Sequence, residues 1–78
     1  MRDLIDFIAT SLVDDPTQVR VRETRRGSHV ILKLRVAKED MGRVIGKGGR
    51  VANAMRTLLR IAAAQSGQRA TLDIVEPR

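Results

Sequence analysis

A run of three glycines and one lysine at positions 46–49 (Gly-Lys-Gly-Gly) is the part of the 78-residue sequence whose residue types and spacing could hold a ligand. Arg43 precedes it by three residues, and Arg50 follows it directly. Glycine has no Cβ, so another backbone can approach it closely, and cations beside such a turn attract phosphate without selecting a base sequence. The pattern therefore predicts a phosphate contact.

Two other glycine-rich phosphate-binding motifs do not fit this segment. A P-loop requires G-x-x-x-x-G-K-[ST] after a strand; counted from Gly42, the lysine comes one position early, and Gly48 offers no hydroxyl for a magnesium ion. A dinucleotide fingerprint G-x-G-x-x-G would need a glycine in place of Val51 and a preceding strand. We therefore predict no nucleoside triphosphate site, no dinucleotide site and no cofactor.

The charge balance points to the same class of ligand. The formal net charge is +6 at pH 7, and 12 of the 15 basic residues are arginine. Such an excess favours a polyanionic partner, nucleic acid first and an anionic membrane surface second, although arginine richness also follows from GC-rich coding. With one Phe and no Tyr or Trp, the chain lacks aromatic platforms for stacking bases. Binding would have to use backbone amides, cations and aliphatic side chains.

The cysteine content and the lengths of the apolar runs indicate the cellular compartment. The chain contains no cysteine, which excludes disulfides and every cysteine-based metal or redox site. No apolar run approaches the roughly 20 residues of a membrane span, and the N-terminus lacks the apolar region of a signal peptide. These features predict a cytoplasmic protein with no membrane partner.

We predict no catalytic role, no metal site and no small-molecule substrate. His29 is the only histidine, and no carboxylate or serine stands in an evident relation to it. The carboxylates at positions 14–15 precede a proline and are interpreted as a solvated connector. Glu39 and Asp40 are explained by the preference of acidic side chains for a helix start.

Hydrophobic periodicity predicts the elements that must position the glycines. A spacing of three and four indicates a helix, and strict alternation indicates a strand. A turn is expected over 25–28. In chain order we expect a helix over 3–13, strands over 19–24 and 28–36, a short helix over 38–45, a helix over 50–65 and a strand over 69–75. The apolar stripes expected to be buried are Leu4, Ile5, Ile8 and Leu12 on the first helix, and Val51, Met55, Leu58, Leu59 and Ala62 on the last.

These elements indicate one α+β domain of two layers. The first two strands form a hairpin, and a right-handed crossover through two helices would make the second and last strands parallel. We therefore expect a three-stranded mixed sheet with three helices on one face. The other sheet face carries Arg20, Arg22, Lys33 and Arg35 and is expected to be solvated.

The glycine segment resembles a known family. Residues 44–50 (Val-Ile-Gly-Lys-Gly-Gly-Arg) are similar to the GXXG segment of a KH domain, and residues 40–57, with the chain length, resemble the small bacterial KH proteins of the KhpA type. The resemblance implies a single type II KH domain over 1–78, with element order α-β-β-α-α-β. It implies binding of single-stranded RNA as an RNA chaperone or post-transcriptional regulator, and a homodimer or a heterodimer with a larger KH-containing protein.

The resemblance also suggests roles for individual residues. Arg43 and Lys47 would contact phosphate, and Ile45 would contact bases, with ordinary core packing as its alternative. The three loop glycines would allow close backbone approach. Arg50 and Asn53 would make polar contact. Arg56 and Arg60 lie one and two turns further along the helix, where they either belong to a solvated face or extend the phosphate track.

Two other functions stay open at this point. A helix, a glycine turn and a helix also match a DNA-binding helix-turn-helix, with Arg50, Asn53 and Arg56 near the start of the reading helix. A protein-interaction module is the second alternative, in which the basic surface serves solubility and an apolar helix face makes a dimer.

Overall fold

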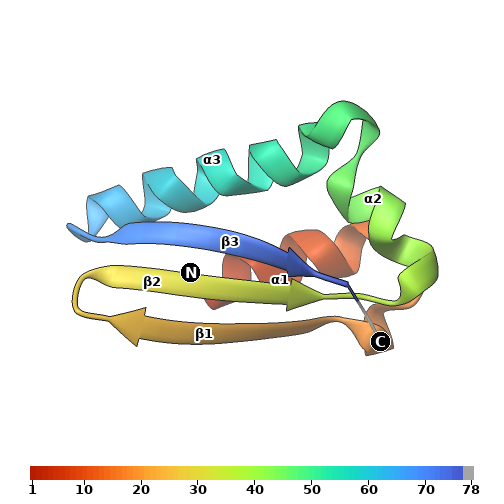
Figure 1. The fold of residues 1–78 in the computed structure, drawn as a ribbon, viewed down its shortest axis with the longest axis horizontal. Coiled ribbons are helices and arrows are strands. Elements are labelled where there is room, and N and C mark those ends of the chain that lie inside the picture. Colours follow the sequence, from red (N-terminus) through yellow and green to blue (C-terminus); the bar gives the residue numbers. More distant parts are fainter. Residues whose placement is uncertain (77–78) are drawn as a thin grey trace.

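The computed structural model describes residues 1–76 as a three-stranded sheet with helices on one side (Figure 1). Three α-helices and three strands are accompanied by three single turns of 3₁₀-helix. The elements in chain order are α1 (Arg2–Leu12), η1 (Pro16–Gln18), β1 (Arg20–Arg26), β2 (His29–Arg35), η2 (Lys38–Asp40), α2 (Met41–Ile45), η3 (Lys47–Gly49), α3 (Arg50–Gln65) and β3 (Arg69–Val75). No helix in this part of the chain is long and apolar enough to cross a membrane.

The sheet has the strand order β1-β2-β3, with one antiparallel and one parallel pairing. Arg20 lies opposite Arg35 in the antiparallel hairpin, and His29 lies beside Arg69 in the parallel pair. The parallel pair requires a crossover, which α2 and α3 provide between β2 and β3. This arrangement confirms the predicted α+β class, the mixed sheet and the α-β-β-α-α-β order.

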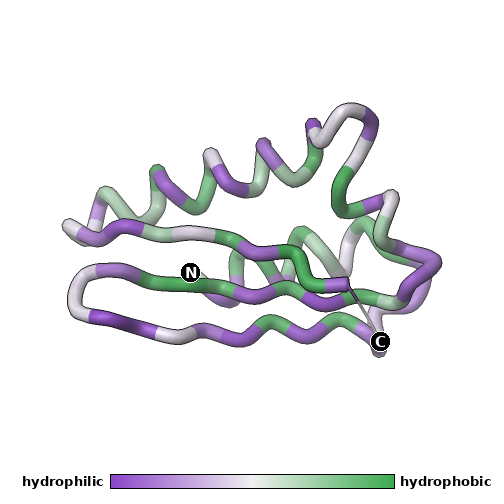
Figure 2. Tube along the Cα trace, in the orientation of Figure 1, coloured by the Kyte–Doolittle hydropathy of each residue, from purple (hydrophilic) through white to green (hydrophobic). Residues whose placement is uncertain are grey.

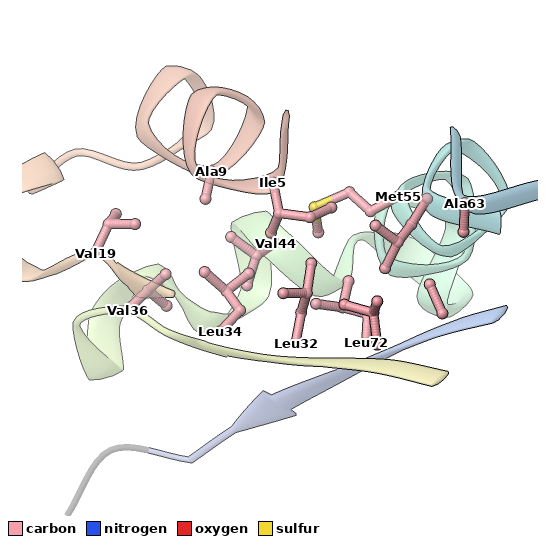
Figure 3. Close-up of a cluster of buried hydrophobic side chains, with 13 residues drawn as sticks. Ile5, Ala9, Val19, Leu32, Leu34, Val36, Val44, Met55, Ala63 and Leu72 are labelled. Atoms are coloured by element: carbon pink, nitrogen blue, oxygen red, sulfur yellow. The ribbon is translucent and has the colours of Figure 1, made fainter. Parts of the chain in front are cut away.

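The hydrophobic core lies between the sheet and the helices (Figure 3). Leu32 and Leu34 point from β2 toward Ile5 of α1 and Met55 of α3, and all four are buried. Val44 brings α2 into the same cluster. Because each strand alternates sides, only the inward half of the sheet residues contributes, and the outward half is left on the opposite face.

The predicted helix stripes are partly wrong. Leu58 is 48% exposed and Leu12 is 38% exposed, whereas Ala9, Ala52 and Ala63 are buried. The buried residues of α3 are Ala52, Met55, Leu59 and Ala63, and those of α1 are Ile5 and Ala9. Small side chains let a helix approach a sheet closely, so the alanines help set the rotation of each helix, in which Leu59 is buried while Leu12 and Leu58 turn outward.

The hairpin turn is shorter than predicted. Arg25 and Arg26 continue β1, and only the two residues Gly27 and Ser28 form the turn. Gly27 has a φ of 57°, a conformation that suits a two-residue hairpin turn. As a result, β1 pairs with β2 along its whole length and carries more arginine than the predicted strand.

Candidate nucleic-acid interface

The glycine loop, residues 46–49, joins α2 to α3 at the end of the molecule away from the hairpin turn (Figure 1). It consists of Gly46 followed by the single 3₁₀ turn η3. Gly46 donates its N–H to the Gly42 carbonyl at 2.9 Å, and Gly49 donates to the Gly46 carbonyl at 3.1 Å. These bonds hold the chain in a tight corner between the two helices.

Gly46 is required by packing. Its φ is 75° and its ψ is 168°, a combination that only glycine adopts readily. A Cβ at this position would lie 2.5 Å from Cγ2 of Val51 and 2.8 Å from the Val51 nitrogen. The loop therefore lies directly against the first turn of α3, and packing against Val51 is enough to require a glycine at position 46.

Gly48 occupies the opposite kind of environment. Its φ is 65°, and a Cβ there would meet nothing within 4 Å. Two exposed cations flank Gly48 in the sequence: Lys47 directly before it and Arg50 two residues after it. Of the three loop glycines, Gly48 is the one beside which a sugar-phosphate backbone has free space.

The loop ends at the start of α3. Gly49 is the N-cap, with a φ of 79°, and has no side chain that could accept a hydrogen bond from the first helical turn. An α-helix of 16 residues carries about half a positive charge at this end, on amides that lack an intrahelical acceptor. Together with Lys47 and Arg50, this end of α3 provides an anion-attracting surface built mainly from backbone.

The residue before the loop adds an apolar component. α2 has only five residues, and Val44 is fully buried while Ile45 is 37% exposed. The alternative considered for Ile45, ordinary core packing, accounts for only part of its surface. Ile45 directly precedes the glycine loop, so its exposed part is available for an aliphatic contact with a base of a strand bound at the loop.

Arg43 lies in a different environment from the one predicted for a free phosphate ligand. Its Nη2 is 2.8 Å from Oδ2 of Asp14, and its Nε is 3.2 Å from Oδ1 of Asp40. The guanidinium is half-exposed but already paired with two carboxylates. The structure thus ties Arg43 to the connector between α1 and β1.

Asp40 is the buried centre of that connection. Its carboxylate accepts the backbone N–H of Asp14 at 3.0 Å and that of Asp15 at 3.1 Å, and it is 2% exposed. The N–H of Asp14 contributes most to lowering the pKa of Asp40; burial opposes this effect, and the N–H of Asp15 and the charge of Arg43 add to it.

Our interpretation of Asp40 as a helix-start residue was therefore incomplete. Its side chain makes no capping hydrogen bond to α2, and it binds residues 25 and 26 positions earlier in the chain. The sequence contained one signal, since an acid three residues before Arg43 has the spacing of a helical ion pair. Asp40 fixes the base of α2 and thus the position from which the glycine loop begins.

The candidates further along α3, beyond Arg50, are also engaged with the protein. Arg56 donates from Nε to the Leu72 carbonyl of β3 at 3.2 Å and from Nη1 to Oδ1 of Asn53 at 3.4 Å. Arg60 lies further along the helix, with Nη2 at 3.5 Å from Thr57 Oγ1. Arg56 therefore connects α3 to β3, a border strand of the sheet.

The predicted site residues thus fall into two groups. Ile45, Lys47, Gly48 and Arg50 present exposed surface at one place, with Gly46 and Gly49 shaping the backbone between them. Those that already have protein partners are Arg43, Asn53 and Arg56. Within residues 1–76, no cluster of three or more His, Cys, Asp or Glu could hold a metal ion. The exposed group is suited to binding a backbone phosphate.

Comparison with known proteins gives a consistent result. Residues 2–74 match the family described as the KhpA/KhpB KH domain. The chain is 47% identical over 75 residues to RNA-binding protein KhpA of Clostridium acetobutylicum, covering 96% of this chain and 100% of that protein. The protein of the same name from Treponema pallidum is 49% identical over 74 residues, with 95% and 92% covered. That from Chlamydia pneumoniae is 40% identical over 78 residues, with 100% of both covered.

Two solved structures share the fold. An Era variant from Aquifex aeolicus bound to GDP·AlF4⁻ gives a TM-score of 0.62 at 16% identity, covering 94% of this chain and 28% of that one. Era in complex with MgGDPNP and nucleotides 1506–1542 of 16S ribosomal RNA gives 0.56 at 17% identity, with the same coverage. At such identities the likeness concerns the fold alone, in about a quarter of the larger protein.

Proposed function

Because the chain belongs to the KhpA/KhpB KH-domain family, we propose that it binds single-stranded RNA without catalysing a reaction, and that the glycine loop holds the sugar-phosphate backbone. A KH loop of this kind contacts about four nucleotides. The names of the bacterial relatives, each called an RNA-binding protein and matched over at least 92% of its length, support RNA as the ligand. We further propose that the protein acts in the bacterial cytoplasm as an RNA chaperone or post-transcriptional regulator.

The observation that carries this proposal is the contrast between Gly46 and Gly48. A tightly packed glycine fixes the loop against α3, and an open one leaves free space beside the N-terminal turn of that helix. Lys47 and Arg50 add charge without closing the approach. Such a site recognises a phosphate backbone and has no group that would select a particular base.

The first test replaces Lys47 and Gly48 with aspartate and measures binding of a six-nucleotide RNA by fluorescence polarisation. We expect K47D/G48D to weaken binding by at least tenfold, because two anions would face the phosphates. The matched control is K38D/G67D, which makes the same charge change at another lysine and at another glycine with positive φ and open space. Affinity within twofold of the original protein for K47D/G48D would rule out the loop as the contact.

The DNA-binding alternative makes a different prediction in the same assay. A helix-turn-helix places its reading helix in a duplex groove, whereas here α2 has only five residues and β3 lies alongside α3. We expect single-stranded RNA to bind more tightly than duplex DNA at equal salt. The reverse order would favour the helix-turn-helix.

Self-association is a second property that one observation favours. Leu58 and Ile61 lie three residues apart on α3, and they are 48% and 54% exposed. Adjacent exposed aliphatic side chains on one helix favour burial against a second copy or a KH-containing partner. We propose a homodimer through this face of α3. Sedimentation equilibrium of L58S/I61S would show a shift toward monomer, and an unchanged dimer would place the interface elsewhere.

A further inference from the structure

The face of the sheet turned away from the helices carries a dense array of cations. Cross-strand partners share a face, so the register places four residues of each strand on this side. The six basic residues among them, all exposed, are Arg20, Arg22, Arg26, Lys33, Arg35 and Arg69. We call these six residues the cationic face. Among the strand residues on this side, only Asp73 carries a carboxylate.

The view of Figure 1 shows the strands passing in front of α1, and hence shows this side of the sheet. In the same orientation, Figure 2 shows hydrophilic colour along most of β1, and hydrophilic positions that alternate with hydrophobic ones toward the end of β2. The glycine loop lies apart, at the junction of α2 and α3 in the helical layer. The cationic face and the glycine loop are therefore separate surfaces.

Like charges oppose each other across the strands of the cationic face. Arg20 lies opposite Arg35, and Arg22 lies opposite Lys33. Directly opposed like charges destabilise a sheet. The ion pairs formed within residues 1–76 involve Arg25 and Arg43, and neither residue belongs to the cationic face. Asp73, beside Lys33 on β3, relieves part of this repulsion. The fold holds the remaining cations together at a cost, which a bound polyanion would offset.

The surface has a shape that can receive a chain of phosphates. The sheet forms a shallow concavity of about 410 Å³, lined by Arg20, Val21, Arg22, Lys33, Arg35 and Val75. Along each strand the same-face residues repeat every ~6.6 Å, and neighbouring strands lie ~4.8 Å apart. A regular lattice of cations suits a polymer with regularly repeated negative charge.

We propose that the cationic face is a second binding surface for the RNA sugar-phosphate backbone, which contacts the segment next to the one held by the glycine loop. This inference rests on the proposed RNA binding. An acidic protein is a less suitable occupant because protein interfaces need an apolar centre, and Ile31 and Val75 are the only large apolar side chains among the strand residues here, both partly buried. No Phe, Tyr or Trp occurs among these strand residues, and His29 is their one imidazole, so phosphate contact outweighs base stacking on this face.

Two surfaces predict a dependence on RNA length. The longest dimension of the molecule is 35 Å and its thickness is 18 Å. A strand of 30 nucleotides is roughly 100 Å long even when stacked at about 3.4 Å per nucleotide, whereas a hexanucleotide is about 20 Å. The long RNA can occupy the glycine loop and continue around the sheet edge, and the short RNA fills only the loop.

The test compares a variant of the cationic face with a charge-matched control on both RNAs. R22Q/K33Q/R35Q removes three cations of the face and leaves Arg20, which donates to the Thr17 and Val19 carbonyls. The control R2Q/R25Q/K38Q removes three exposed cations from other parts of the surface. Polarisation is measured from 50 to 300 mM KCl with an unstructured 30-nucleotide RNA and with a hexanucleotide.

We expect the face variant to bind the hexanucleotide within twofold of the original protein and to bind the long RNA about tenfold more weakly. The slope of log K against log salt for the long RNA should fall in magnitude by about 2, because each phosphate that the protein no longer neutralises reduces it by roughly 0.7. The control should retain both the affinity and the slope. Two outcomes would overturn the proposal. Equal losses of long-RNA affinity in the two triple variants would show a general effect of net charge, and an unchanged long-RNA affinity in the face variant would show no contact at all.

The same data separate this proposal from the loop contact. If K47D/G48D leaves hexanucleotide binding intact, the proposed function of the glycine loop is wrong, whatever the triple variants show. If K47D/G48D abolishes hexanucleotide binding and the face variant binds both RNAs normally, the loop contact stands and the second surface is wrong. Thermal unfolding of R22Q/K33Q/R35Q should show no loss of stability, since removing opposed like charges relieves repulsion.

Discussion

The glycine loop and the cationic face present positive charge in opposite ways. At the loop, about half a positive charge from the amides at the start of α3 adds to the charges of Lys47 and Arg50, and the glycines leave the approach to them open. On the sheet, charge comes from six long side chains on a rigid backbone. The loop thus depends on backbone geometry, and the sheet face depends on how many cations it holds.

The difference indicates how each surface would respond to change. A geometric site is sensitive to a single methyl group and fairly insensitive to salt, because it makes few ionic contacts. A lattice of exposed cations tolerates single substitutions and weakens steeply with salt, since each phosphate contact releases counterions. The predictions below test this contrast, starting with the substitution expected to have the largest effect.

The largest effect is expected for Gly46→Ala. The new Cβ would overlap Val51 and force alanine into a conformation that suits glycine, lowering the free energy of unfolding by about 3 kcal/mol. Hexanucleotide affinity should fall with it, because the loop must move. Urea denaturation and polarisation measure the two effects.

The matched control for this prediction is Gly48→Ala. It also has a positive φ but meets no atoms within 4 Å, so it should cost only about 1 kcal/mol. If the two alanine substitutions destabilise the protein equally, packing against Val51 is not what fixes the loop. The description of the glycine loop as a site that depends on backbone geometry would then be wrong.

The second effect concerns the base of α2. Because hydrogen bonds from Asp14 and Asp15 hold the pKa of Asp40 below its ordinary value, the ionised carboxylate stabilises the fold at neutral pH. That contribution disappears as the pH falls through the lowered pKa of Asp40. We expect Asp40→Asn to be destabilised at pH 7 and the gap from the original protein to narrow in acid. A gap that is constant with pH would contradict this account.

A smaller effect is expected for Arg56→Leu. Loss of the hydrogen bond to the Leu72 carbonyl should lower the free energy of unfolding by about 1 kcal/mol. Hexanucleotide affinity should change by less than threefold, since this guanidinium already has protein partners. A large loss of affinity with unchanged stability would show that Arg56 leaves β3 to contact RNA, as the sequence had suggested.

The smallest effect should be a gain. Arg22→Glu places a carboxylate opposite Lys33, converting a repulsive pair into an attractive one worth about 0.5 kcal/mol. The same change should weaken binding of the 30-nucleotide RNA. Stabilisation together with weaker binding would show that the cations of the cationic face favour RNA binding and lower the stability of the fold. A destabilised variant would contradict repulsion between Arg22 and Lys33.

Local patterns predicted those parts of the molecule that local physics determines. Alternation located β3 at residues 69–75, and the glycine run at 46–49 separated the two helices on either side of it, because period and turn residues act over a few positions. The turned-out Leu58 could not be predicted, since the rotation of α3 depends on where Ala52 and Ala63 allow close approach to the sheet.

The candidate site shows the same division. The glycine loop was evident from its residue types, whereas the partners of its cations were not. Arg56 reaches a carbonyl 16 positions away, and Arg43 reaches a carboxylate 29 positions away. Such contacts depend on the finished fold. The alternation of Arg20 and Arg22 with Val21 was visible in the sequence, but only the strand register shows that Lys33 and Arg35 lie directly opposite these arginines.

The arginines of β1 also bear on how copies of the protein behave at high concentration. β1 lies at the border of the sheet, and its outer side has no neighbouring strand among the described residues. A seven-residue border strand can pair with the same strand of another molecule and start aggregation. Five of its seven residues are charged, four of them arginine, so approaching copies repel each other. Residues suited to holding RNA would thus also keep the free protein dispersed.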